Sequence, residues 1–207
     1  MSDPLDVLRR IREPRRADAP QPGERCDLCS EPVPEDHGHV VDLRERSLLC
    51  ACRGCYLLFT PEGAGGGHYR SVPDRYLAFR DVQLTAAHWD ALQIPVSVAF
   101  FFMNSDLGRI AAFYPGPAGA TESLLSLDTW DDIVTANPVL ATLEPDVEAV
   151  LLRSEADRSN VECFLVPIDT CYELVGTLRQ LWRGFDGGSE AHAALDGFFA
   201  RVREQAR

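Results

Sequence analysis

Lysine is absent from this 207-residue chain, and all twenty of its basic residues are arginine. This excludes every mechanism that depends on a lysine amine, including Schiff-base chemistry and phosphate binding by a P-loop lysine. Long apolar runs are absent as well. The longest, PVSVAFFFM at 95–103, falls well short of the roughly 18 apolar residues that a membrane span needs. We therefore expect no membrane insertion.

The start of the chain does not have the pattern of a signal peptide. In MSDPLDVLRRIREPRR, isolated apolar residues are set among charges, whereas a signal peptide carries a continuous apolar segment. We expect a cytoplasmic protein, and in a reducing compartment clustered cysteines are metal ligands more often than disulfides.

Positive charge is scarce in the second part of the sequence. Residues 1–80 carry 12 Arg against 13 acidic residues, whereas residues 81–207 carry 8 against 19, which is a net charge of -11 out of -12 for the chain. Nucleic-acid binding requires clustered positive charge, so we expect no nucleic-acid partner. An acidic surface of this kind suits a protein partner with a basic surface.

Cysteine is also sparse, but five of the seven cysteines lie within residues 26–55. CDLC and CRGC form two C-x2-C elements with 22 residues between them. Each element can wrap a tight turn around a metal ion, and two such turns complete a tetrahedral shell of four sulfurs. The predicted metal ligands are Cys26, Cys29, Cys52 and Cys55.

Zinc is the metal that we expect at this site, with iron as the alternative. Zn²⁺ needs no redox partner, and a module of this size has too little core to fold without a metal or a disulfide.

Cys50 is the odd cysteine of CACRGC. Side chains alternate along a strand, so Cys50 faces the same side as Cys52 if the segment is extended. It is a small apolar residue packed beneath the metal, a substitute ligand, a second thiol linked to the site by proton transfer, or a group that takes part in metal exchange. His37 and His39 share one strand face and could join Cys50 in a second or alternative site, although a solvent-facing histidine pair is the competing interpretation.

Composition divides the chain into four segments. The sequence predicts an N-terminal helix with a Pro-rich linker, then a cysteine module around the hairpin HVVDLRERSLL, a Gly-rich hinge and connection, and an acidic α+β domain. Their residues are 1–25, 26–60, 61–80 and 81–207, respectively.

The fold class that we predict is α+β, with a zinc-ribbon-like module followed by a larger domain of two ββα units. The units should form a mainly antiparallel sheet with the helices on one face. PGPAGA is expected to break the chain between the strand 109–114 and the helix 127–136. The predicted strands are 95–103, 109–114, 147–153 and 161–168, and the predicted helices are 85–92, 127–136, 169–182 and 189–205.

Other candidate residues have simpler structural explanations. Cys171 lies at the start of a predicted helix, where the helix dipole lowers a thiol pKa, but no catalytic partner stands near it in sequence. We predict buried packing for Cys171 and Cys163. AGATES at 118–123 is either a ligand loop or a capping segment, and Asp131 and Asp132 are read as a solvated helix face.

Several motifs together resemble an uncharacterised actinobacterial family found in gene neighbourhoods of uptake nickel-iron hydrogenases. They are CDLC, HGHVVDL, LLCACRGCYLLF, YPGPAGATESLL and WRGFDGG, and the resemblance spans most of residues 26–200. It implies an accessory role in maturation, assembly or electron delivery. The C-x2-C pair is also similar to the knuckles of zinc ribbons and rubredoxins, but it lacks the proline and glycine arrangement typical of rubredoxin, which disfavours iron.

These observations favour a non-catalytic, metal-binding accessory or adaptor protein whose partner is a hydrogenase or its maturation factor. Two other functions stay open. One is a rubredoxin-like iron electron carrier, and the other is an enzyme with a pocket in the C-terminal domain. The second remains because catalytic groups that meet in a fold need not be close in sequence.

Overall fold

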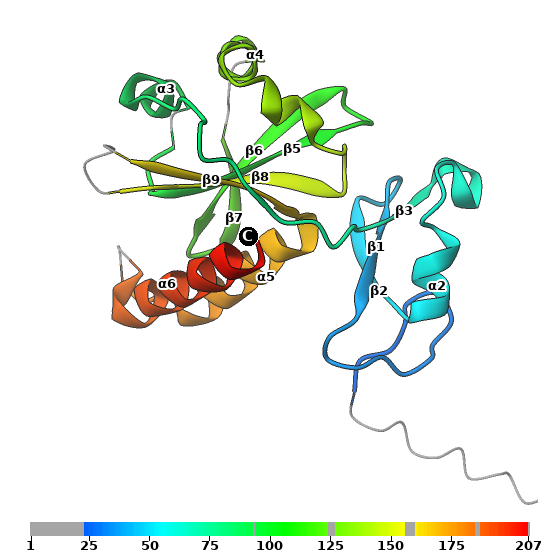
Figure 1. Ribbon diagram of the computed structural model, residues 1–207. Helices are drawn as coiled ribbons and strands as arrows, with labels where there is room; N and C mark the ends of the chain where they lie inside the picture. Colours follow the sequence, from blue (N-terminus) through cyan, green and yellow to red (C-terminus); the bar gives the residue numbers. More distant parts are fainter. Residues whose placement is uncertain (1–22, 93, 124–126, 156–159, 185–186, 207) are drawn as a thin grey trace, which may run out of the picture.

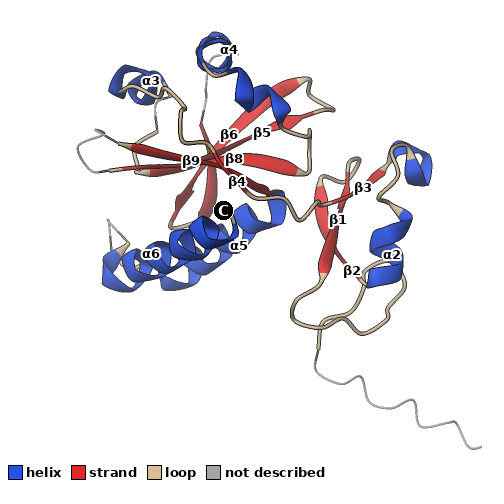
Figure 2. Cartoon of the chain, in the orientation of Figure 1, coloured by secondary structure: helices blue, strands red, loops and turns tan. Residues whose placement is uncertain are grey.

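The computed structural model describes residues 23–92, 94–123, 127–155, 160–184 and 187–206. Within these residues the chain forms two β-sheets, each accompanied by helices (Figures 1 and 2). The helix predicted near the N-terminus lies outside the described residues. In chain order the elements are β1 (Gly38–Asp42), β2 (Ser47–Ala51), α2 (Arg53–Leu58), η1 (Ala64–Gly67), β3 (Tyr69–Ser71), β4 (Leu77–Ala78), α3 (Ala86–Ala91), β5 (Val98–Asn104), β6 (Arg109–Gly116), β7 (Gly119–Ser123), α4 (Leu127–Ala136), η2 (Pro138–Thr142), β8 (Glu148–Ser154), β9 (Val161–Pro167), α5 (Ile168–Leu181) and α6 (Gly188–Gln205).

The smaller sheet has the order β2-β1-β3, and both strand pairs are antiparallel. β1 and β2 form the hairpin predicted from the alternating sequence. Its turn is held by the carboxylate of Asp42, which accepts hydrogen bonds from the backbone N–H groups of Arg44 (2.9 Å) and Glu45 (3.0 Å). This hairpin positions the residues on both sides of CRGC.

The larger sheet has the order β4-β9-β8-β5-β6-β7, and every neighbouring pair is antiparallel. Two hairpins, β5–β6 and β8–β9, lie side by side through the β5–β8 pair. The predicted α+β class and the mainly antiparallel sheet are therefore confirmed.

The prediction that the helices gather on one face of this sheet is wrong, because helices cover both faces (Figure 1). Val98 and Phe100 of β5 pack toward α5 and α6, while the alternate residues Ala99 and Phe101 pack toward α3 and α4. The run VSVAFFFM explains the error. A strand that is buried on both faces reads as continuous apolar sequence, without the alternation that marks a solvent-facing side.

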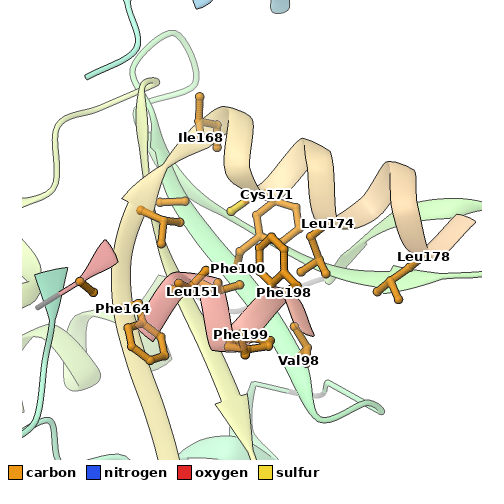
Figure 3. Close-up of a cluster of buried hydrophobic side chains, with 14 of the residues drawn as sticks. Val98, Phe100, Leu151, Phe164, Ile168, Cys171, Leu174, Leu178, Phe198 and Phe199 are labelled. Carbon is orange, nitrogen blue, oxygen red and sulfur yellow. The ribbon is translucent and has the colours of Figure 1, made fainter. Parts of the chain in front are cut away.

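The α5–α6 face contains the larger cluster of buried side chains (Figure 3). The predicted apolar stripe of the last helix is present, with Phe198, Phe199 and Val202 buried and Leu195 packed at the edge of the cluster. Helix α6 is therefore held by the same spacing of apolar residues that identified it in the sequence.

The segment PGPAGA, expected to break the chain after the strand 109–114, forms a tight turn between β6 and β7. β6 runs through Gly116, and the chain returns as β7 with Gly116 opposite Gly119. Gly119 has φ 117°, a conformation that L side chains rarely adopt, so glycine is required at this end of the turn. AGATES, considered as a ligand loop, is mostly an edge strand.

The segment 61–80, predicted as a hinge and connection, contributes a strand to each sheet. β3 pairs with β1, and β4 pairs with β9. Val41 and Leu48 of the small sheet also pack against the α5–α6 cluster. The two sheets are therefore connected by side-chain packing as well as by the chain.

Among the described residues, no helix combines the length and apolarity needed to cross a membrane.

A buried ion pair fixes the connection to the larger sheet. Glu148 of β8 has a fully buried side chain, and Arg75 donates hydrogen bonds to both of its carboxylate oxygens, with 2.6 Å between Arg75 Nε and Glu148 Oε1. The backbone N–H of Glu144 donates to the same carboxylate at 2.8 Å. Because the pair is buried on the glutamate side, losing the arginine leaves an uncompensated charge.

We therefore expect Arg75→Leu to lower the free energy of unfolding by about 3 kcal/mol. The matched control is Arg109→Leu, which removes a pair with Glu122 in which both side chains are about two-fifths exposed, and which should cost at most about 1 kcal/mol. Urea denaturation followed by circular dichroism measures both values. Equal losses in the two variants would show that Glu148 does not depend on its partner.

Candidate metal centre

The four predicted ligands come from two turns that a pair of hydrogen bonds holds together. Asp27, inside CDLC, donates its backbone N–H to the carbonyl of Cys50 (2.9 Å), and its side-chain carboxylate accepts from the N–H of Cys50 (2.7 Å). The first turn is thereby fixed to the end of β2, just before CRGC. Ser30 closes this turn with its N–H on the Cys26 carbonyl at 2.8 Å.

The second turn is the start of a helix, which the sequence did not predict. Cys52 is the N-cap of α2, and its Sγ accepts a hydrogen bond from the N–H of Cys55 (3.5 Å). A C-x2-C element at a helix N-terminus therefore points both sulfurs at the same side of the first turn, where backbone N–H groups favour negative charge.

The sulfurs of the four cysteines converge. One ligand atom from each of Cys26, Cys29, Cys52 and Cys55 lies within 4.8 Å of the others. The Sγ atoms of Cys29 and Cys52 are 3.6 Å apart, which is too long for a disulfide. A tetrahedral Zn²⁺ with bonds of about 2.3 Å to sulfur has S···S edges of about 3.8 Å. The cluster therefore fits a tetrahedral metal ion without rearrangement of the fold.

The surrounding protein groups shift the pKa values of these thiols in different directions. Burial would raise the pKa of Cys26, which is 2% exposed, but backbone N–H groups, led by that of Cys52, outweigh burial and lower the pKa to about 6. Burial and hydrogen bonds with the neighbouring thiols raise the pKa of Cys55 to about 12. A divalent cation supplies the charge that lets all the sulfurs ionise together.

The donor set fits zinc and iron alike, since both bind four thiolates in tetrahedral geometry. Cys26 is buried, Cys52 and Cys55 are partly buried, and Cys29 is exposed. The centre therefore lies near the surface of the module, with one of its four ligand residues exposed.

Cys50 belongs to a different cluster. One ligand atom from each of His37, His39 and Cys50 lies within 4.8 Å of the others. His39 and Cys50 are directly opposite in the β1–β2 pair, and the rings of His37 and His39 have centroids 4.8 Å apart. The structure thus brings together the three residues that the sequence offered as alternates, apart from the four-cysteine group.

A cleft of about 810 Å³ borders this second cluster and runs between the cysteine module and the α+β domain. His37 and His39 lie on one side of it, and Tyr76 and Asp169 lie on the other. Cys52 also lines the cleft. The cleft therefore lies beside the metal-binding module, and neither Cys171 nor β7 lines it.

Asp169 is a candidate site residue that the sequence analysis missed. The sequence places it only at the start of the predicted helix 169–182, but its carboxylate accepts a hydrogen bond from Nδ1 of His39 at 2.8 Å, across 130 residues of sequence. No local pattern could have identified this contact, because it depends on how β1 and α5 meet.

The remaining cysteines are structural. Cys171 is fully buried in the α5–α6 cluster (Figure 3), and burial followed by the charge of Asp169 raises its pKa well above the usual thiol value. Burial raises the pKa of Cys163 to about 12. The predicted packing role of both is confirmed, and the activated-thiol alternative for Cys171 is wrong. Asp131 and Asp132 are exposed, as predicted.

The fold and site together define a protein with a four-cysteine module attached to an antiparallel α+β domain. Residues 25–206 match the model of a family described as a family of unknown function (DUF5947), and the chain belongs to this family. The matched range includes both sheets. No curated protein and no solved structure matches the chain.

Serine substitution at Cys26, Cys29, Cys52 or Cys55 should abolish the metal that the purified protein retains through dialysis. Each substitution removes one of four sulfurs from a site whose metal contributes about 10 kcal/mol or more in small zinc modules. Elemental analysis of the purified chain measures the loss.

Cys50→Ser is the matched control, because it changes a neighbouring thiol that belongs to the other cluster. It should retain the tightly held metal. Retention in Cys52→Ser together with loss in Cys50→Ser would transfer the ligand role to Cys50.

Proposed function

We propose that this protein is a metal-binding accessory protein that holds a protein partner, and that the partner is a hydrogenase or one of its maturation factors. The convergence of Cys26, Cys29, Cys52 and Cys55 carries the proposal. Four protein ligands complete a tetrahedral shell and leave no position for a substrate, which is typical of structural centres.

Zn²⁺ is the metal that we propose for this centre. The module has few buried apolar side chains, and a metal that stabilises the fold needs no redox chemistry. All seven cysteines are free thiols, which suits a reducing compartment such as the cytoplasm.

Two features support the binding of a protein partner. Leu57 and Leu58 follow Cys55 on α2 and are 50% and 65% exposed, so they offer apolar contact area beside the sulfurs. Residues 81–207 carry a net charge of -11, which would attract a partner with a basic surface. The hydrogenase itself is proposed from the motif resemblance described above.

The test is capture of a hydrogenase subunit or maturation factor by the tagged chain in its native host, followed by binding kinetics with the purified pair. Leu58→Ser should weaken binding roughly tenfold, because truncating an interface leucine removes about 1.4 kcal/mol. Raising the salt concentration should slow association more than it speeds dissociation.

Leu107→Ser is the matched control, since Leu107 is 43% exposed in the β5–β6 turn, away from α2. It should bind as the unmodified chain does. If no hydrogenase component is captured, or if the two leucine variants bind equally, the proposal is wrong.

The exposure of Cys29 favours a second candidate function, electron transfer by iron in the same four-cysteine centre. Electron transfer requires a redox centre close to the surface, and this centre meets the requirement. A red preparation with a reversible one-electron couple that is lost in Cys29→Ser would establish the iron carrier. A colourless preparation containing zinc supports the accessory role.

A further inference from the structure

We propose that His37, His39 and Cys50 form a second metal site, separate from the four-cysteine centre, which binds a divalent transition cation of the zinc class and leaves one coordination position open to the cleft. Asp169 is the positioning residue of this site. The proposal does not depend on which metal the four cysteines bind or on which partner the protein holds.

The β1–β2 register places the three side chains together. His39 and Cys50 are paired across the antiparallel strands, so their side chains project from the same face of the small sheet. His37 lies just before β1, and its ring centroid is 4.8 Å from that of His39. The β1–β2 pair therefore supplies two of the donors, and the residue before β1 supplies the third.

The hydrogen bonds of the two histidines leave the correct nitrogens available. Nδ1 of His37 lies 2.8 Å from the carbonyl oxygen of Pro34, which can only accept, so Nδ1 carries the proton and Nε2 holds the lone pair. Nδ1 of His39 donates in the same way to the Asp169 carboxylate at 2.8 Å. A histidine whose other nitrogen donates to a carbonyl or carboxylate is the usual arrangement around a protein-bound metal.

A second observation, the burial of Nε2 of His37, also points to a bound ligand. The side chain of His37 is only 6% exposed, and its Nε2 atom is buried with no hydrogen-bond partner among the described residues. Glu24 does not satisfy it, because the Glu24 carboxylate lies 3.6 Å from Nδ1, the other nitrogen. Burying an acceptor without a partner destabilises the fold, and a metal ion bound by Nε2 would remove that cost.

The donor types determine the class of metal. Two imidazoles and one thiolate suit Zn²⁺ and its neighbours, whereas Mg²⁺ and Ca²⁺ prefer oxygen ligands. In a tetrahedral shell such donors lie about 3.3–3.5 Å apart, and in this cluster the three donor atoms already lie within 4.8 Å of one another. Three protein ligands leave the fourth position for a water molecule or a group in the cleft.

The test uses the full-length chain with its tightly held metal in place. Zn²⁺ added in calorimetric titration and in equilibrium dialysis should bind at one further site per chain, more weakly than at the first. His37→Gln, His39→Gln and Cys50→Ser should each abolish this second binding and keep the first. His68→Gln, which changes a histidine just before β3 that lies outside the cluster, is the matched control and should retain both.

Cobalt distinguishes the site from adventitious binding. When Co²⁺ fills the second site, a thiolate-to-cobalt charge-transfer band should appear, and it should be absent in Cys50→Ser. The near-isosteric serine keeps the test informative even if a histidine variant fails to fold. If the unmodified chain takes up no second Zn²⁺, or if Cys50→Ser retains the band, the proposal is overturned.

Asp169→Asn tests the positioning role. The amide can still accept a hydrogen bond but lacks the carboxylate charge, so the second Zn²⁺ should bind roughly 10–100-fold more weakly while the first metal is unaffected. Unchanged affinity for the second Zn²⁺ would overturn the role assigned to Asp169.

Discussion

The convergence of the four cysteine sulfurs is the constraint on which the N-terminal module depends. In the described residues up to 72, the buried apolar side chains are few, and α2 buries none of its own. They are Cys26, Val40, Ala51 and Val72. A core of this size cannot offset the entropy lost in ordering the turns around it. A metal ion bound by both C-x2-C turns would supply the stabilisation that side-chain burial does not.

Contacts with the α+β domain also stabilise the module. They lie on the face that carries the histidines. Val41 and Leu48 pack against the α5–α6 cluster, and Asp169 at the start of α5 holds His39. The same contacts that attach the module therefore orient a side chain beside the cleft. A change in the position of His39 would weaken its hydrogen bond to α5, because a carboxylate–imidazole hydrogen bond depends on both distance and direction.

The local features of this chain could be predicted from its sequence, whereas those that depend on meeting in space could not. The C-x2-C pair is visible because ligand spacing is short, and the hairpins β5–β6 and β8–β9 are visible as paired apolar runs. The prediction that the helices lie on one face was wrong because Phe100 and Phe101 are buried on opposite faces of the sheet. A strand buried on both faces lacks the alternation of apolar and polar residues that would have shown this. The contact between His39 and Asp169 spans 130 residues and leaves no periodic signal.

The cysteines show how environment separates residues of one type into different roles. Cys163 and Cys171 are buried among apolar side chains, where a thiolate is unfavourable, and they contribute volume to the core. Cys50 differs from both the core thiols and the four-cysteine group, because its strand register directs it toward two imidazoles. The cysteines that are not fully buried all lie in the module. The thiols that solvent or a ligand can reach are therefore gathered in the module, and the α+β domain contacts this part of the chain through the hydrogen bond of Asp169 to His39.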